Sequence, residues 1–232
     1  IGTIQPIREI AKVIRHFKKH SIQKSAFPYF HIDASQAAVY AQISVEDLHA
    51  DLLTLDGAKI YGPKGIGMLF VRRGVHISPM ILGGGQEEGR RSGTESLPLI
   101  VGFAEAFSIA ATEAVSEAKR VLPLRELLIK GVLHIFPRAH LNGSLEMRLP
   151  NNANFCFPGQ DGEFLVLRLD AKGIAVSGSS SCRTLSENIR SYVVDLLGDA
   201  RCGESSVRFT LGKSTTKKDI QYVLSVLKKM FS

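Results

Sequence analysis

Apolar residues recur every three or four positions near the start of the chain, at Ile4, Ile7, Ile10, Ala11, Ile14 and Phe17. This spacing is that of one helix face, so it predicts an amphipathic helix over residues 6–19. Two short apolar runs, 29–33 and 50–55, are typical of buried strands. Between them Ser44 predicts the amino-terminal cap of a short helix, 44–48. A third strand is predicted over 67–71, after a glycine-rich bend.

The alternation of helices and strands continues through the second half of the chain. The pattern predicts helices over 97–119, 122–136, 162–170, 187–197 and 216–231, the last capped at Thr215, and strands over 153–157, 174–177 and 206–210. Helices that alternate with strands in this way indicate an α/β fold. A domain boundary is expected within the helices between about 110 and 140.

Composition narrows the class of protein. The chain is 44% hydrophobic and 22% charged, which is ordinary for a folded domain. No uninterrupted apolar run approaches the roughly 18 residues of a membrane span, and the first residues do not resemble a signal peptide. The net charge is +7, but the basic residues are dispersed and are not interleaved with aromatics. Solvated faces and an anionic small ligand therefore explain the charge better than nucleic acid does.

Cysteine usage favours a reducing compartment. The three cysteines, Cys156, Cys182 and Cys202, are widely spaced and do not resemble a disulfide framework, so a cytoplasmic location is expected. No CxxC pair or sequence cluster of histidine and cysteine indicates a metal site. Cys156 lies between two phenylalanines and is expected in the core, whereas Cys202 has no evident role. Cys182 lies in a serine-rich loop beside Arg183, which favours an accessible, reactive thiolate.

A lysine in a turn is the strongest candidate for chemistry. Lys59 follows the apolar run 50–55 and precedes a glycine-rich bend, the position where an α/β enzyme places a reactive amine. Such an amine forms an imine with an aldehyde. Asp33 ends the preceding strand and could keep a pyridine nitrogen protonated, and Gln36 could bond a phenolic oxygen. The alternatives are a solvated lysine, a helix-capping Asp33 and a surface Gln36.

Two further residues could bind anions. Arg208 lies on the predicted strand 206–210, and its fork-shaped guanidinium suits a substrate carboxylate. A structural ion pair is the equal alternative. Thr94 follows a glycine-rich loop and offers a hydroxyl and nearby backbone amides to a phosphate. Residues 62–67 lack the Gly-Lys-Ser/Thr ending of a Walker motif, which argues against nucleotide hydrolysis.

Taken in order, these motifs resemble the cysteine desulfurases, which are pyridoxal phosphate (PLP) enzymes of fold type I in the class V aminotransferase group. The segments that carry the resemblance are 1–7, 31–36, 59–67, 83–87, 91–94, 149–152, the Cys182 loop and 208–212. The resemblance implies an α/β fold in two parts. Residues 1–120 would be the carboxyl-terminal part of a PLP-binding large domain with a mostly parallel sheet. Residues 121–232 would be a smaller α+β domain that carries the cysteine loop.

The resemblance also implies how the cofactor is held. Lys59 would be the catalytic lysine that binds PLP covalently and shuttles protons. Gly57, in the same turn, belongs to the cofactor-binding set. Asp33 would pair with the pyridine nitrogen, and Gln36 would bond the phenolic oxygen. Thr94 would reach the PLP phosphate of the partner subunit, which implies a homodimer.

For the substrate, the resemblance implies L-cysteine. Arg208 would hold its carboxylate, and Cys182 would attack its sulfur, which releases L-alanine and leaves a persulfide. The long Cys182 loop is closer to the branch that serves iron–sulfur cluster assembly. A sulfur acceptor or iron–sulfur scaffold protein would then be the partner. A selenocysteine lyase would look nearly the same, and another class V aminotransferase would not need Cys182.

The chain departs from the family pattern in two places. Asp56-Gly57-Ala58 stands where the family usually has Ser-Gly-His, so Asp56 brings a second negative charge toward the phosphate and Ala58 supplies no donor. The family's amino-terminal region, with its phosphate-binding loop, is expected to be missing before Ile1. These departures keep open a non-catalytic or truncated fragment of the same fold.

Overall fold

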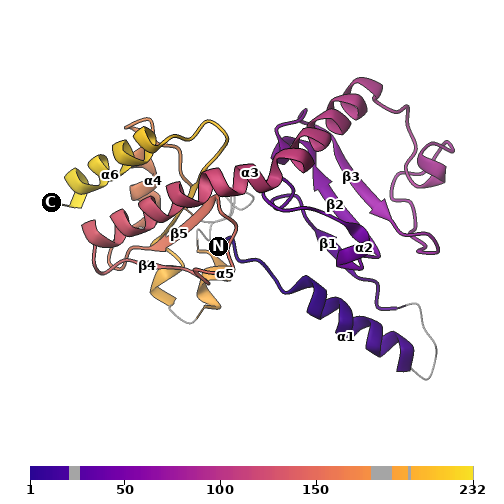
Figure 1. The fold of residues 1–232 in the computed structure, drawn as a ribbon, viewed down its shortest axis with the longest axis horizontal. Coiled ribbons are helices and arrows are strands. Elements are labelled where there is room, and N and C mark those ends of the chain that lie inside the picture. Colours follow the sequence, from indigo (N-terminus) through magenta and orange to yellow (C-terminus); the bar gives the residue numbers. More distant parts are fainter. Residues whose placement is uncertain (21–26, 179–189, 198–199, 232) are drawn as a thin grey trace. The chain divides into compact units, whose positions relative to one another are not determined.

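The computed structural model describes residues 1–20, 27–178, 190–197 and 200–231 (Figure 1). These residues divide into two compact units. One consists of Pro6–Val115, and the other of Ile1–Gln5 together with Ser116–Ser232. The sequence placed the boundary at 120/121 and kept the first residues with the large domain. Each unit is described by itself below.

A three-stranded sheet is the centre of the unit Pro6–Val115. Its strands are β1 (His31–Asp33), β2 (Leu52–Asp56) and β3 (Gly67–Val71), in the order β1-β2-β3. β1 runs parallel to β2, and β3 runs antiparallel to it. The apolar positions Ile32, Leu53 and Leu55 are at most 7% exposed, as the apolar runs predicted.

Short and long helices accompany this sheet. They are α1 (Ile7–His20), α2 (Val45–Leu48) and the 3₁₀ helices η1 (Gly57–Ile60) and η2 (Glu87–Gly89). The predicted cap of α2 is confirmed, because the Ser44 side chain accepts a hydrogen bond from the Asp47 N–H at 3.2 Å. The α1 prediction of 6–19 differs from the observed helix by one residue at each end.

The second unit is built around an antiparallel sheet. Its strands are β4 (His140–Leu141), β5 (Asn152–Cys156) and β6 (Ser206–Thr210), in the order β4-β5-β6. The helices are α4 (Gly162–Asp170), α5 (Tyr192–Asp195), η4 (Ala200–Cys202) and α6 (Lys217–Phe231). Every residue of β5 is buried. The predicted strand 174–177 is reduced to one bridge between Ser177 and Arg208, and β4 was not predicted.

The segment Ile1–Gln5 packs in this second unit because a buried arginine holds it. Arg148 is 3% exposed and donates to the backbone carbonyl of Ile1 at 2.5 Å and to the side chain of Asn152 at 3.0 Å. The Leu149 N–H donates to the Gly2 carbonyl at 2.9 Å. Burial, and secondarily the charge of Arg125, lowers the pKa of Arg148 to about 10. Hydrogen bonds to uncharged acceptors thus fix the start of the chain here.

A single helix, α3 (Leu97–Ile135), replaces the two helices that were predicted. Pro123 lies inside it, and an internal proline costs roughly 3 kcal/mol through one lost hydrogen bond and a clash. Val121 and Leu128, on either side of Pro123, are at most 1% exposed. Burial of such side chains contributes about 1.5–3 kcal/mol each, enough to offset the proline and continue the helix.

The composition of α3 also qualifies the membrane prediction. One 18-residue window of this helix has a mean hydropathy of 1.5, and 17% of that window is buried. By length and composition alone the helix could cross a membrane, although no uninterrupted apolar run of that length exists. A helix whose apolar face is covered by another part of a protein has the same composition.

A clamp between α3 and the start of α6 gives a pH-dependent contribution to stability. Arg120 donates to both Glu117 carboxylate oxygens, at 2.7 and 2.8 Å, and to the carbonyls of Thr215 and Gly212 at 2.8 and 2.9 Å. The hydrogen bond from Arg120 lowers the pKa of Glu117, and partial burial opposes that shift. A lowered carboxyl pKa stabilises the fold above the unfolded value, and this is lost as pH falls through the folded value.

We therefore expect Glu117→Gln to reduce the free energy of unfolding at pH 7 by about 0.5–1 kcal/mol. The deficit should shrink as the pH falls below about 4.3, where the unfolded carboxyl protonates. Urea unfolding at pH 7 and pH 4 measures both values, and Glu105→Gln, an exposed position on the same helix, is the control. An equal deficit at the two pH values would contradict the proposed charge effect.

Candidate functional site

The parallel pair β1 and β2 brings three candidate residues to one edge of the sheet. Asp33 is the last residue of β1 and lies opposite Thr54 of β2, and the Ala34 N–H donates to the Thr54 carbonyl at 3.0 Å. β2 then passes directly into η1, which carries Lys59. Gln36 lies in the turn that follows β1. The carboxyl ends of parallel strands share an edge, so these residues lie at the edge where α/β proteins bind ligands.

The three side chains are available to a ligand in the described structure. Asp33, Gln36 and Lys59 are all exposed. One carboxylate oxygen of Asp33 accepts a hydrogen bond from the Ser35 N–H at 3.0 Å. This Asx-type turn fixes the carboxylate at the end of the strand. The local arrangement is therefore set by the backbone rather than by burial.

The turn that presents Lys59 is closed tightly at Gly57. The Gly57 N–H donates to the Ile66 carbonyl at 2.9 Å, and the Gly62 N–H donates to the Gly57 carbonyl at 2.9 Å. A Cβ atom at Gly57 would lie 2.8 Å from the Pro63 carbonyl oxygen and 2.9 Å from that of Ile66. Only glycine fits beside these two backbone carbonyl groups, so the position of Lys59 depends on Gly57.

Asp56 has a structural role that the sequence did not indicate. It caps η1, because its Oδ1 accepts a hydrogen bond from the Ala58 N–H at 2.8 Å. Ala58, which supplies no side-chain donor, thus satisfies its backbone N–H within the turn. This cap is a local hydrogen bond. It neither supports nor contradicts the expectation that the charge of Asp56 acts on a phosphate.

Thr94 belongs to the same unit as Lys59. It is exposed and follows a loop that the buried Ser92 anchors, since the Ser92 hydroxyl contacts the carbonyls of Ile81 and Leu82 at 3.1 and 2.9 Å. Gln86 accepts a hydrogen bond from the Gly93 N–H at 3.3 Å. The loop therefore presents Thr94 from an ordered base.

Arg208 lies in the other unit, on β6 opposite Asn154. Its backbone exchanges hydrogen bonds with Ser177, at 2.6 and 3.1 Å. Its Nε atom is buried and has no hydrogen-bond partner among the described residues. Leaving a buried donor without a partner costs roughly 1–3 kcal/mol, more for a charged group. A buried Nε donor of this kind fits the binding of a carboxylate, whereas the alternative of a structural ion pair at Nε finds no support in the described part.

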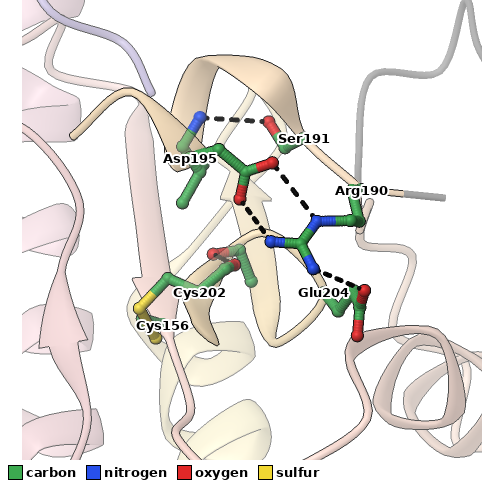
Figure 2. Close-up of polar contacts among 8 residues, drawn as sticks. Cys156, Arg190, Ser191, Asp195, Cys202 and Glu204 are labelled. Carbon is green, nitrogen blue, oxygen red and sulfur yellow. Dashed lines mark hydrogen bonds and ion pairs between the residues drawn. A yellow bond between two sulfur atoms is a disulfide. The ribbon is translucent and has the colours of Figure 1, made fainter. Parts of the chain in front are cut away.

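Cys182, the predicted nucleophile, lies outside the described residues. The other two cysteines correct the sequence analysis. Cys156 and Cys202 form a disulfide, 46 residues apart in sequence (Figure 2). The expectation of no disulfide was wrong, and Cys202 does have a partner. The burial predicted for Cys156 is confirmed, since it is 0% exposed.

The reason lies in the pairing of β5 with β6, which sequence spacing does not reveal. This pairing sets Cys156 opposite Ser206, four residues after Cys202, and the turn at η4 returns Cys202 to Cys156. His140 also lies here, with its Nε2 3.2 Å from the Cys202 sulfur. A spatial cluster of histidine and cysteine thus exists, although the sequence shows no motif for one.

The α/β sheet with a lysine turn at its carboxyl edge defines the class of protein by its fold, which is the PLP fold type I of NifS-like proteins. The chain belongs to the aminotransferase class V family, whose model matches residues 1–223. The resemblance drawn from the motifs and the predicted α/β fold class are both confirmed.

The chain is similar to curated cysteine desulfurases over nearly its whole length. Cysteine desulfurase IscS of Dictyoglomus turgidum is 39% identical over 230 residues, which are 99% of this chain and 56% of the relative. Cysteine desulfurase IscS 1 of Archaeoglobus fulgidus is 42% identical over 98% of this chain and 56% of its own. A probable mitochondrial cysteine desulfurase of Dictyostelium discoideum is 42% identical over 99% and 49%. The chain therefore spans about half the length of the curated relatives it matches.

Solved structures agree with this fold. A NifS-like protein superimposes with a TM-score of 0.86 at 34% identity, over 99% of this chain and 57% of that one. The NifS-like protein from Rickettsia africae superimposes with a TM-score of 0.86 at 28% identity, over 99% of this chain and 58% of that one. The similarity thus includes both units and is not confined to the sheet around Lys59.

Proposed function

We propose that this chain is the part of a PLP-dependent cysteine desulfurase that carries the covalent lysine and the substrate-binding arginine. The whole protein would convert L-cysteine to L-alanine and pass the sulfur on, for iron–sulfur cluster assembly or another acceptor. The observation that carries the proposal is the shared edge of β1 and β2, because Asp33, Gln36 and Lys59 all follow the carboxyl ends of these two strands. The names of the relatives supply the reaction class.

The residues at this edge suit the chemistry of PLP. When bound, PLP supplies an electron sink for bonds at the α-carbon of an amino acid. The Asp33 carboxylate, which accepts a hydrogen bond from the Ser35 N–H, would hold a proton on a pyridine nitrogen. The Gln36 amide can donate to a phenolic oxygen. The Lys59 amine, exposed on a rigid turn, can hold the cofactor covalently and afterwards move a proton at Nζ.

The substrate side of the proposal rests on Arg208 and Cys182. The Nε of Arg208, for which the described residues supply no partner, would donate to the carboxylate of L-cysteine. The Cys182 thiolate would form an S–S bond to the substrate sulfur while the carbon–sulfur bond of the substrate breaks. The substrate carbon then takes a proton, which gives L-alanine and a persulfide on Cys182. The atoms balance with no external oxidant.

The assembly in which this occurs is also part of the proposal. Thr94 would serve the phosphate of the partner subunit in a homodimer, and a sulfur-acceptor or iron–sulfur scaffold protein would take the persulfide sulfur. Residues 1–120 would belong to the PLP-binding large domain and 121–232 to the small domain. Cys182 chemistry needs a reducing location, for which we infer the cytoplasm.

The test is to map the lysine that PLP modifies. The chain is incubated with PLP, alone and with the amino-terminal half of a relative supplied in trans, reduced with borohydride, digested and examined by mass spectrometry. We expect one pyridoxyl group per chain, on Lys59. Lys64→Arg is the matched control, because Lys64 is also exposed, five residues further along the chain, and its removal should leave the label unchanged.

Three results would decide against all or part of the proposal. No label in either preparation would leave a non-catalytic fragment of the fold. Label scattered over surface lysines, reduced in proportion by Lys64→Arg, would show that Lys59 is not special. Labelling of Lys59 without alanine formation from L-cysteine would retain the cofactor site and reject the desulfurase reaction.

A further inference from the structure

The side chains of His140, Cys156 and Cys202 form a compact cluster in the second unit. Their ligand atoms all lie within 4.8 Å of one another, and His140 Nε2 is 3.2 Å from the Cys202 sulfur. The two cysteines are at most 1% exposed, whereas His140 is exposed. The cluster is therefore closed on the sulfur side and open to solvent on the imidazole side.

Regular backbone pairing creates this cluster. His140 of β4 lies directly opposite Cys156 of β5, so their Cβ atoms are cross-strand neighbours. Cys202 comes from the turn before β6, and its Cα lies 5.2 Å from that of Cys156. All three positions are thus set by the sheet and would persist when the sulfur atoms are not bonded to each other.

Hydrogen bonds fix the turn that carries Cys202. The Ser206 hydroxyl donates to the Cys202 carbonyl at 2.5 Å, and the Asn142 side chain donates to that hydroxyl at 2.9 Å. Figure 2 shows Arg190 beside the same turn, where it contacts Asp195 at 3.1 Å and Glu204 at 2.9 Å. These contacts hold the η4 segment against α5 independently of the disulfide.

We propose that the reduced form of this cluster is a binding site for a thiophilic divalent cation of the zinc type, with His140, Cys156 and Cys202 as ligands. Two thiolates and a neutral imidazole are a ligand set that zinc favours. Metal–sulfur bonds of about 2.3 Å and metal–nitrogen bonds of about 2.0 Å place tetrahedral ligand atoms roughly 3.5 Å apart. The 3.2 Å separation of His140 Nε2 from the Cys202 sulfur is close to that value.

Charge also favours a divalent cation. Two buried thiolates would be costly alone, and a cation of charge two neutralises both. The exposed side of His140 provides the entry path and leaves a fourth position for water. The site is therefore shielded from solvent at the two thiols and accessible to solvent beside the imidazole.

Formation of the site depends on redox state. A dithiol reductant breaks the Cys156–Cys202 bond by exchange, which gives two protein thiols and one molecule of oxidised, cyclic reductant. The cation then displaces two protons from these thiols as it binds. The disulfide form offers only His140 as a ligand. The oxidised cluster therefore holds a disulfide, and the reduced cluster binds a cation. Neither form requires activity at Lys59.

The experiment is a cobalt titration, with Co²⁺ as a spectroscopic substitute for zinc. It uses the whole chain with Cys182→Ser, which removes the third thiol from the background. The protein is reduced with a phosphine, freed of reductant without oxygen, and titrated while thiolate-to-cobalt absorption is recorded. Elemental analysis after gel filtration gives the stoichiometry. The same protein kept as the disulfide is titrated in parallel.

We expect one Co²⁺ per reduced chain, with thiolate-to-cobalt absorption that zinc abolishes, and neither in the disulfide form. His140→Ala should weaken binding at least about tenfold, the effect seen on losing even outer-shell support. His134→Ala, an exposed histidine of the same unit, should leave binding unchanged. Because His140 is exposed, its removal spares the fold, which circular dichroism checks. Absence of uptake by the reduced chain, or uptake that His140→Ala leaves unchanged, would overturn the proposal.

Discussion

Replacing Lys59 by alanine should reduce the rate of alanine formation from L-cysteine by about 10²–10⁴-fold, the range that a positioned proton-transfer group contributes. Lys59 is exposed, so the free energy of unfolding should change by less than about 0.5 kcal/mol. Catalytic loss without loss of stability is the expected signature of a residue that acts on the reaction. The measurements are turnover, in the preparation that proves active, and urea unfolding of the same samples.

Two variants separate the amine from its charge and from its position. Lys59→Arg keeps a positive charge in the η1 turn but removes the amine that binds an aldehyde, and it should be as inactive as Lys59→Ala. Lys64→Ala removes another exposed lysine, five residues further along the chain, and should keep full turnover. If Lys59→Ala retained more than a tenth of the parent rate, Lys59 would not be the catalytic amine.

Replacing Asp33 by asparagine should lower turnover by about 10²-fold or more, comparable to the loss of one preorganised electrostatic contact at a reacting group. Asparagine keeps an oxygen that can accept from the Ser35 N–H, so the turn after β1 is retained. What is lost is the negative charge that favours a protonated pyridine nitrogen. The expected result is a chain that still gives the Lys59 label but turns over slowly.

The label and the rate together make this second prediction specific. Asp47→Asn removes an exposed carboxylate on α2 of the same unit and should change neither. Equal loss of label and turnover in Asp33→Asn would indicate that Asp33 supports the site only structurally. Unchanged turnover would remove Asp33 from the catalytic residues.

Local signals in the sequence were sufficient for most of the secondary structure. The bounds of β3, α4 and β6 were predicted without error, because each is a short apolar segment with clear turn or capping residues at its ends. The Asp161 side chain, for example, caps α4 by accepting from the Glu163 and Phe164 N–H groups. Such signals act within a few residues, which is the range that a sequence pattern describes.

The sequence prediction was wrong where the path of the chain outside an element determines a contact, as at the cap of α6. Thr216, not Thr215, exchanges hydrogen bonds with Asp219 at the start of α6, and this bond lowers the pKa of Asp219. Thr215 instead accepts a hydrogen bond from the Gly212 N–H at 2.9 Å. Two adjacent threonines offer the same cap in sequence, and only the path of the chain into the helix distinguishes them.

The candidate site divides in the same way. The placement of Asp33, Gln36 and Lys59 after the carboxyl ends of β1 and β2 could be predicted, because it follows from two consecutive strands and the turns after them. The Cys156–Cys202 disulfide could not, since it depends on the pairing of β5 with β6 across 46 residues. Whether these two cysteines meet is determined by the tertiary pairing of the strands and not by the types of the neighbouring residues.

At Asp56, the side-chain oxygen that caps η1 determines the backbone conformation of the turn that carries Lys59, whereas the charge of the side chain determines the electrostatic potential there. The hydrogen bond to the Ala58 N–H needs only a side-chain oxygen, which serine or asparagine also provides. The backbone of η1 is then indifferent to whether position 56 is charged. Exchange among these residues would alter the field felt by an anion bound near Lys59 without displacing its amine. Cofactor affinity in this fold can therefore change by single substitutions that leave the catalytic geometry intact.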